Sequence, residues 1–288
     1  MKYSVIDIGS NSVRLLLWAD GCSVYKKINT TRLGSGVEKD GALSEEAIAR
    51  TVLAVEQFSV QARQDGAKEV FAFATAAVRS AKNGADFVLA VKNACGLDVD
   101  VISGEEEARI GLLGALEGRD GGIIDVGGAS SEVTVGKRGK IVYAVSADVG
   151  AVRLKDACGE NIAALRSFID ERIAVYGEIP RSEMTAVGGT ATTLAALVGQ
   201  VEPYDPQKTH GMVISTEEVL FWSEKLLSMR QEERLRLKGM DKNRADILGG
   251  GLLLLYSVLC KAGAERFTVS EKDNMEGYLL DKCGRDKS

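Results

Sequence analysis

Two short turns rich in glycine and serine each follow an aspartate at the end of an apolar strand. The first is Asp7-Ile8-Gly9-Ser10-Asn11-Ser12, and the second is Asp125-Val126-Gly127-Gly128-Ala129-Ser130-Ser131. Small residues leave backbone N–H groups unhindered, so such turns can bind phosphate, while Asp7 and Asp125 can orient a hydrated Mg²⁺. A tight hairpin with a capping aspartate is the alternative for one turn alone. Two matching turns, together with Gly188-Gly189-Thr190 at a helix start, favour the phosphate site.

Three consecutive carboxylates, Glu105-Glu106-Glu107, open a predicted helix. Acidic residues in the first turn complement the helix dipole, so capping alone would explain them. One of them could instead act as a general base on water if neighbouring carboxylates and partial burial raise its pKa. The sequence does not decide which of the three carboxylates would do so.

Arginines beside small residues form a third group of candidates. They are Arg14 after the first turn, Arg79 after Ala74-Thr75-Ala76-Ala77-Val78, and Arg153 after Gly150-Ala151-Val152. Arginine stays charged and binds phosphate oxygens through two N–H groups at once. An ordinary surface arginine is the alternative for each. Small neighbours would let a ligand approach the backbone near Arg79.

Several common catalytic patterns do not occur in the sequence. His210 is the only histidine, which excludes a metal site made of several histidines. The sequence contains neither a GxxxxGK(S/T) phosphate loop nor a GxSxG nucleophile elbow. With a net charge of -5, the chain is not a general nucleic-acid binder, so a polyanionic substrate needs a local positive field or a divalent cation. The chemistry is therefore expected to use loops, a metal ion and a carboxylate.

Hydrophobic periodicity predicts alternating strands and helices around these residues. The expected strands are 3–8, 13–18, 69–74, 99–102, 122–126, 132–135, 141–145 and 266–269. The expected helices are 44–62, 86–94, 103–116, 162–175, 190–197, 216–228, 244–260 and 274–282.

The strand–turn–strand unit around Asp7 recurs around Asp125, which indicates an internal repeat. Duplicated halves commonly face each other across a cleft that holds the site. The polar, glycine-rich segment 117–121 marks the expected boundary. We therefore predict an N-terminal domain of residues 1–118 and a C-terminal domain of residues 119–288.

Composition agrees with a two-domain protein of the cytoplasm. The chain has 288 residues, of which 45% are hydrophobic and 27% charged, as in ordinary globular proteins. Five scattered cysteines indicate reduced thiols, and the first residues run directly into a strand, which leaves no room for a targeting segment. No apolar run reaches the roughly 18 residues that a membrane span needs.

Seven segments together resemble the exopolyphosphatase/guanosine pentaphosphate phosphohydrolase (Ppx/GppA) family. They span nearly the whole chain in the family's order, and the set is highly specific although each piece alone is weak. The segments are Asp7-Ile8-Gly9-Ser10-Asn11-Ser12-Val13-Arg14, Gly34-Ser35-Gly36, Ala74-Thr75-Ala76-Ala77-Val78-Arg79, Ser103-Gly104-Glu105-Glu106-Glu107-Ala108-Arg109, Asp125-Val126-Gly127-Gly128-Ala129-Ser130-Ser131-Glu132, Gly150-Ala151-Val152-Arg153-Leu154 and Gly188-Gly189-Thr190.

The resemblance implies an α/β protein with the actin-like ATPase fold of sugar kinases and chaperone ATPases, in which two ribonuclease-H-like domains flank a cleft. It also implies hydrolysis of the terminal phosphoanhydride of inorganic polyphosphate, with Mg²⁺ or another divalent cation. Hydrolysis of the 5′-γ-phosphate of guanosine pentaphosphate is the alternative. A homodimer is a further expectation; a nucleic-acid polymer or a membrane is not an expected partner.

The matching motifs assign roles to individual residues. Glu107 aligns with the family's catalytic glutamate and is the expected general base. Asp125 and Glu132, with Asp7, are expected at the metal and the attacking water. The expected substrate ligands are Ser10, Asn11, Ser12, Arg14, Arg79, Gly127, Gly128, Ala129, Ser130, Ser131, Gly189 and Thr190.

Two departures from the family pattern affect these expectations. Ala129 replaces a glycine, which matters only if that position needs a positive φ. The family's Ser-Asp-x-Gly-Leu-Arg-Glu-Gly is here Ser270-Glu271-Lys272-Asp273-Asn274-Met275-Glu276-Gly277, which puts the contacts of that segment in doubt. A phosphate-binding sensor without turnover, or a kinase of the same fold, therefore remains an alternative class. The chain also ends where longer members continue into a helical domain, so a short or nucleotide-bearing substrate is as plausible as a long polymer.

Overall fold

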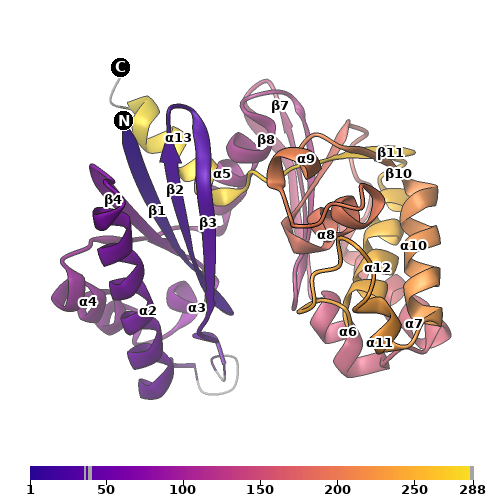
Figure 1. Ribbon diagram of the computed structural model, residues 1–288, viewed down its shortest axis with the longest axis horizontal. Coiled ribbons are helices and arrows are strands. Elements are labelled where there is room, and N and C mark those ends of the chain that lie inside the picture. The colour runs from indigo at the N-terminus through magenta and orange to yellow at the C-terminus, as the bar shows by residue number, and fades with distance from the viewer. Residues whose placement is uncertain (36, 38–40, 286–288) are drawn as a thin grey trace. The chain divides into compact units, whose positions relative to one another are not determined.

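The computed structural model describes residues 1–35, 37 and 41–285. Packing divides the chain into two units, Met1–Ile110 with Asn274–Ser288, and Gly111–Asp273. Each unit contains one mixed sheet, in agreement with the α/β prediction (Figure 1). Gly36, a residue of one family motif, lies outside the described residues.

The first unit contains a five-stranded sheet. Its strands are β1 (Lys2–Ile8), β2 (Ser12–Ala19), β3 (Cys22–Thr30), β4 (Glu69–Ala74) and β5 (Val99–Val101). They lie in the order β3-β2-β1-β4-β5. The first three strands form an antiparallel meander, and β4 and β5 run parallel to β1.

Helices cover both faces of this sheet. They are α2 (Glu45–Gln64), α3 (Ala76–Ser80), α4 (Gly84–Cys95), the first part of α5 (Gly104–Leu116) and α13 (Asn274–Arg285). Side chains alternate between the two faces of a strand, so Ile6 packs with α2 and α4 while Val5 packs with α5 and α13. The predicted cap of α2 is confirmed, because Ser44 Oγ accepts a hydrogen bond from Ala47 N at 3.2 Å.

The second unit contains a six-stranded sheet. Its strands are β6 (Gly121–Val126), β7 (Ser131–Lys137), β8 (Lys140–Ala147), β9 (Met184–Val187), β10 (Val213–Ser215) and β11 (Arg266–Val269). They lie in the order β10-β11-β9-β6-β7-β8. An antiparallel meander, β6 to β8, again precedes two strands, β9 and β11, that run parallel to its first member, while β10 pairs antiparallel with β11. This shared order confirms the internal repeat.

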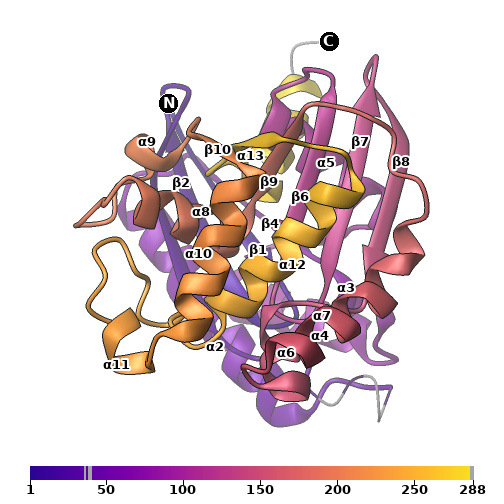
Figure 2. The same cartoon turned by 90° about the vertical axis from the view of Figure 1, so that its right-hand side faces the viewer.

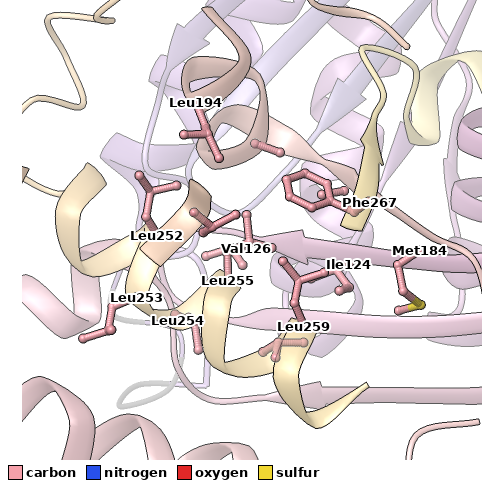
Figure 3. Packing of buried hydrophobic residues seen from close by; sticks show 14 of the residues in the cluster. Ile124, Val126, Met184, Leu194, Leu252, Leu253, Leu254, Leu255, Leu259 and Phe267 are labelled. Atoms are coloured by element: carbon pink, nitrogen blue, oxygen red, sulfur yellow. The ribbon is translucent and has the colours of Figure 1, made fainter. Parts of the chain in front are cut away.

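Helices of the second unit pack a large apolar core against its sheet. They are α6 (Ala151–Cys158), α7 (Ile162–Ile173), the 3-10 helix η1 (Ala174–Tyr176), α8 (Gly188–Val198), α9 (Pro206–Thr209), α10 (Thr216–Ser228), α11 (Gln231–Arg234) and α12 (Leu248–Lys261). Figure 2 shows α10 and α12 side by side over the sheet. In this core Leu255 and Leu259 of α12 lie against Ile124 of β6 (Figure 3).

Three strands and four short helices of the described residues were not predicted. They are β3, β9 and β10, and α3, α6, α9 and α11. Strand β3 lies at the edge of its sheet and is exposed along most of its length, so its residues lack the alternation that marks a half-buried strand. Lysines on such an edge discourage pairing with another chain. Helix α12 begins at Leu248, four residues after its predicted start.

The packing units differ from the predicted domain ranges in two places, the boundary between the units and the last residues of the chain. The prediction assigned residues 274–288 to the second domain, whereas α13 packs with the first unit. Its side chains Met275, Tyr278 and Leu279 join the buried cluster of that sheet. The other division falls inside α5, after Ile110. None of the helices in the described part of the chain is long and apolar enough to cross a membrane.

Candidate active site

The first phosphate-loop candidate joins β1 to β2 and is fixed by backbone hydrogen bonds. Gly9 N donates to Ser12 O at 3.0 Å, and Ser10 O accepts from Gly34 N at 2.8 Å. Asn11 O accepts from Arg32 N at 2.8 Å. These bonds use carbonyl groups, so the exposed Ser10 and Asn11 keep their side chains available for a ligand.

Asp7 and Arg14 lie opposite each other on β1 and β2 and form an ion pair. Arg14 donates to Asp7 Oδ2 from Nε at 2.9 Å and from Nη2 at 2.5 Å. Asp7 is buried, whereas about one-third of the Arg14 side chain is exposed. The predicted metal ligand and the predicted phosphate ligand therefore bind each other here, and Arg14 offsets the charge of Asp7.

Arg79 and Glu107 come together on the first unit. Arg79 Nη1 donates to Ile102 O at 2.6 Å and to Glu107 Oε2 at 3.3 Å. Both side chains are about one-third exposed, so a ligand can reach them. The first bond fixes the guanidinium to the start of α5, where Glu107 lies.

The three glutamates at the start of α5 have different surroundings. Glu105 is exposed. The pKa of Arg109 is raised mainly by its hydrogen bond to Asp281 of α13, and the pKa of Tyr278 mainly by burial; the charge of Glu106 adds to both, which places this carboxylate near those two side chains. Glu107 instead lies beside Arg79. Among the three, Glu107 is the one that the structure associates with a phosphate-binding candidate.

The second phosphate-loop candidate joins β6 to β7 and repeats the geometry of the first. Gly127 N donates to Ser130 O at 3.0 Å, the same bond that Gly9 makes in the first loop. Ala129 does not adopt a positive φ, so alanine fits without backbone strain. The two loops are thus equivalent in their backbone bonding.

The start of α6 supports the second loop from behind. Gly128 O accepts from Val152 N at 2.9 Å and from Arg153 N at 3.1 Å. Gly150 lies so close to the loop that an added Cβ would be 2.5 Å from Gly128 C and O. Only glycine allows this approach.

Asp125 and Glu132 are direct cross-strand neighbours on β6 and β7. Such neighbours share one face of a sheet, so the two carboxylates lie on the same side. Gly188 has a φ of +78°, and an added Cβ would lie 2.4 Å from Asp125 Oδ1. The glycine at the start of α8 therefore leaves room for the Asp125 carboxylate.

Burial raises the pKa of Glu132 above its ordinary value, and the nearby charge of Asp148 acts in the same direction. Hydrogen bonds from Ser130 and Ser146 oppose that rise, because they stabilise the ionised form. Ser146 Oγ donates to Glu132 Oε1 at 2.8 Å. Burial therefore disfavours the ionised form of Glu132, while the two serine hydroxyls hold its carboxylate in one orientation.

Two predicted substrate contacts have their hydroxyl groups directed into the interior of the second unit. Thr190 Oγ1 donates to Val126 O at 2.9 Å, and Ser131 Oγ lies 2.8 Å from the Tyr176 hydroxyl. Both side chains are buried. This corrects the expectation that these hydroxyls face the ligand, and any contact that the two residues make with phosphate uses their backbone.

A cavity of about 680 Å³ in the second unit lies next to Gly189. Arg244 closes one side, with its guanidinium so close that a Cβ on Gly189 would be 2.0 Å from Arg244 Cζ. Tyr204 and Asn243 also line this cavity. Arg244 was not predicted as a site residue, because the sequence placed it at the start of a helix and gave no sign of its proximity to Gly189.

The donor set of the second unit suits a hard divalent cation. Mg²⁺ prefers oxygen ligands and is usually held by one or two carboxylates together with substrate phosphates and water. Asp125 and Glu132 supply such a pair. Within the described residues, no group of three or more acidic, histidine or cysteine side chains is arranged to hold a metal ion. The pair would therefore act together with the substrate.

Sheet order and the repeated loops define the class of protein. Both units have ribonuclease-H-like topology, and together they make the actin-like ATPase fold. The family model of the Ppx/GppA phosphatase family matches residues 20–286. The chain belongs to this family and is a phosphoanhydride hydrolase.

Known relatives match nearly the whole of this chain. The chain is 30% identical to "Exopolyphosphatase 2" of Mycobacterium tuberculosis over 317 residues, which cover 98% of this chain and 99% of the relative. It is 27% identical to a guanosine-5'-triphosphate,3'-diphosphate pyrophosphatase of Photobacterium profundum, covering 98% of this chain and 59% of the relative. The crystal structure of an Aquifex aeolicus Ppx/GppA phosphatase matches with a TM-score of 0.85 and 29% identity, covering 98% of this chain and 99% of that chain.

Proposed function

We propose that the enzyme hydrolyses the terminal phosphoanhydride bond of inorganic polyphosphate. The observation that carries this proposal is the end-to-end similarity to a relative named as an exopolyphosphatase, which this chain matches over 98% of its own length. The repeated loops and the Arg79–Glu107 pair support it, because they provide the amide donors, positive charge and carboxylate that the reaction needs.

Substrate phosphate binds to the two loops and to Arg79 in this mechanism. Backbone N–H groups and the hydroxyls of Ser10 and Ser12 are the donors on the loops, whereas the Ser130 hydroxyl already bonds to Glu132. Phosphoryl transfer spreads negative charge over the equatorial oxygens, so fixed donors stabilise the transition state. Arg79 is held in advance by the carbonyl of Ile102, which reduces the cost of ordering it.

Glu107 acts as the general base in this mechanism. It orients a water molecule and accepts its proton as the oxygen attacks the terminal phosphorus. The P–O bond to the next phosphate breaks, and the shortened polyphosphate leaves with its charge.

Asp125 and Glu132 would hold a divalent cation, most simply Mg²⁺. When bound, the cation neutralises charge on the phosphoryl oxygens. This contribution explains how a chain with a net charge of -5 can bind a polyanion. Asp7 is the weaker candidate as a metal ligand, because Arg14 already pairs with it.

Hydrolysis of guanosine pentaphosphate is the second candidate. The cavity of about 680 Å³ next to Gly189 favours it, since a nucleoside needs a pocket that a linear polyphosphate does not. One relative is also named for activity on a guanosine polyphosphate.

We also propose a cytoplasmic location, supported by five free cysteines. The homodimer implied by the family resemblance stays a prediction.

Phosphate release tests the proposal. Polyphosphates of several lengths and guanosine pentaphosphate should be compared at equal concentration, with Mg²⁺ and with EDTA. We expect acceptor-independent release, abolished by EDTA, with a higher kcat/KM for polyphosphate. A higher value for guanosine pentaphosphate would select the second candidate. No release from either would indicate a sensor, and release only with an added acceptor would indicate a kinase.

A further inference from the structure

Three residues form a row across the antiparallel part of the second sheet. Asp125 on β6 pairs directly with Glu132 on β7, and Glu132 pairs directly with Ser146 on β8. Directly paired residues have their side chains on the same face, with Cβ atoms about 5 Å apart. The row therefore places a hydroxyl immediately beside the second of the two carboxylates.

The row lies on the sheet face opposite the large core. On β7 the core residues are Val133 and Val135, so Glu132 points the other way. On β8 the residues packed against the core are Tyr143 and Val145, so Ser146 also lies on the opposite face. Ser146 is itself exposed, so packing does not require a serine there.

The Ser146 hydroxyl is committed to one oxygen of Glu132. Ser146 Oγ donates to Glu132 Oε1 at 2.8 Å, a good length for a hydrogen bond to a carboxylate. A glutamate has several rotamers, and a hydrogen bond to one oxygen selects among them. Hydrogen bonds to ionised groups are also about twice as strong as neutral ones.

We infer that Ser146 is a positioning residue, which aims the Glu132 carboxylate for binding the cation and the substrate. The inference rests on the proposed function, since it depends on Glu132 taking part in the reaction. Partners that orient a metal-binding group commonly matter 10- to 100-fold for metal affinity or activity. The alternative is that Ser146 is an exposed serine whose contact with Glu132 has no functional role. Removing its hydroxyl would then change neither metal affinity nor activity.

Variants at Ser146 separate these two possibilities. We expect Ser146→Ala to lower kcat on polyphosphate about tenfold and to weaken Mg²⁺ binding, measured by calorimetry with inorganic phosphate present, by a similar factor. Ser146→Thr keeps the hydroxyl on a strand-compatible side chain and should stay within about threefold of the wild type. Ser228→Ala removes an exposed serine of α10 and serves as the matched control, with no change expected.

Thermal unfolding of each variant shows whether a loss reflects misfolding. If Ser146→Ala lowers the Tm by more than a few degrees, Ser146→Cys replaces it, because cysteine keeps the volume and is a weaker donor. Wild-type kcat and Mg²⁺ affinity in a folded Ser146→Ala or Ser146→Cys variant would overturn the inference. Failure of Ser146→Thr to restore them would do the same.

A double-mutant cycle with Glu132→Gln distinguishes this inference from the proposed function. If Ser146 acts through Glu132, adding Ser146→Ala to Glu132→Gln changes kcat less than twofold. An equal loss in both backgrounds would mean that Ser146 acts by another route, against the inference. Normal activity of Glu132→Gln alone would remove Glu132 from the mechanism, and the role of Ser146 would fall with it.

Discussion

Glu107 and Glu132 show how the surroundings of a carboxylate determine what it can do. Glu107 lies against the guanidinium of Arg79 and remains accessible. Glu132 is surrounded by hydroxyl groups, and burial raises its pKa. A group that must accept a proton from water needs access to it, whereas a cation ligand needs a fixed position. This contrast supports Glu107 as the base and Glu132 as the ligand.

Substitution of Glu107 tests its role at the scale of one residue. We expect Glu107→Gln to lower kcat at least about 100-fold, the usual scale for loss of a general base. The Tm should change little, because the side chain is partly exposed. Phosphate release under single-turnover conditions measures the effect.

Glu106→Gln is the matched control for that experiment. Its carboxylate lies on the side of Arg109 and Tyr278, so kcat should stay within about threefold of the wild type. If Glu106→Gln were the crippling change and Glu107→Gln mild, the assignment of the base would be wrong.

Some site residues could be read from the sequence and others could not. The loops were recognisable because a glycine-serine turn after an aspartate occurs twice. The inward hydroxyls of Ser131 and Thr190 depend on tertiary partners, Tyr176 and Val126, which no local pattern specifies. Ser146 could not be identified from the sequence for a similar reason, because its contact with Glu132 depends on the register between β7 and β8.

At the scale of elements, close backbone contact joins the second loop to α6. Gly150, which directly precedes α6, lies so close to Gly128 that there is no room for a side chain at this position. We expect Gly150→Ala to lower the free energy of unfolding by about 2 kcal/mol or more, since overpacking typically costs about 1–3 kcal/mol and the neighbouring atoms are backbone. Phosphate affinity should fall with it, because the loop must move. Urea unfolding and phosphate binding measure the two effects.

Gly250→Ala provides the control within a helix. An added Cβ there meets Leu165 Cδ2 at 3.6 Å, an ordinary contact. Alanine is a better helix former than glycine, so the variant should gain about 0.5–1 kcal/mol and keep its phosphate affinity. Equal destabilisation by both substitutions would show that the crowding at Gly150 is not the cause.

A buried arginine holds α11 and makes stability depend on pH. Arg234 Nη1 donates to Glu160 Oε1 at 2.7 Å, and this bond is the main cause of the lowered pKa of Glu160. A lowered pKa in the folded state contributes stability above the ordinary carboxyl pKa of 4.5 and loses it as the pH falls further. We expect Glu160→Gln to cost about 1 kcal/mol at pH 7, a modest value because Glu160 is partly exposed.

The difference between the wild type and Glu160→Gln should shrink as the pH falls from about 4.5 through the lowered pKa of folded Glu160, below which both side chains are neutral. Urea unfolding at several pH values measures it. Glu171→Gln, a change at an exposed position of α7, should show no such trend. A constant difference at all pH values would contradict the ionic origin.

Among the elements, prediction succeeded where the core imposes a period. The apolar run of β1, which is buried on both faces, and the capped amphipathic helix α2 are examples. Prediction failed at β3, because it is a solvated edge strand, and at β9, because four buried residues are too few to show a period.

At the scale of the whole molecule, the first unit is discontinuous in sequence. Helix α13 supplies Met275, Tyr278 and Leu279 to its sheet from the far end of the chain. Full burial of such side chains stabilises by about 1.5–3 kcal/mol each. The three together approach the total stability of an ordinary domain, about 5–15 kcal/mol. A division into residues 1–118 and 119–288 separates α13 from the sheet that it covers. The sequence does not show this, because the packing of α13 is a tertiary contact.

Fragments test this dependence. We expect residues 111–273 to unfold cooperatively on their own, because both of their apolar clusters are internal. Residues 1–110 should not fold alone, whereas residues 1–110 joined through a flexible linker to 274–285 should. Circular dichroism during heating distinguishes these outcomes. A cooperative transition of the 1–110 fragment with the Tm of the linked version would contradict the expectation.

The return of α13 also has a consequence for biosynthesis. Translation delivers residues 1–110 first, yet one apolar face of their sheet stays partly uncovered until residues 274–285 have been made. The second unit, residues 111–273, can therefore fold before the first unit does, which reverses the usual order in which the N-terminal domain folds first during synthesis. Trigger-type chaperones would be expected to shield the amino-terminal part during that interval, and stalled nascent chains ending at residue 273 should leave it protease-sensitive.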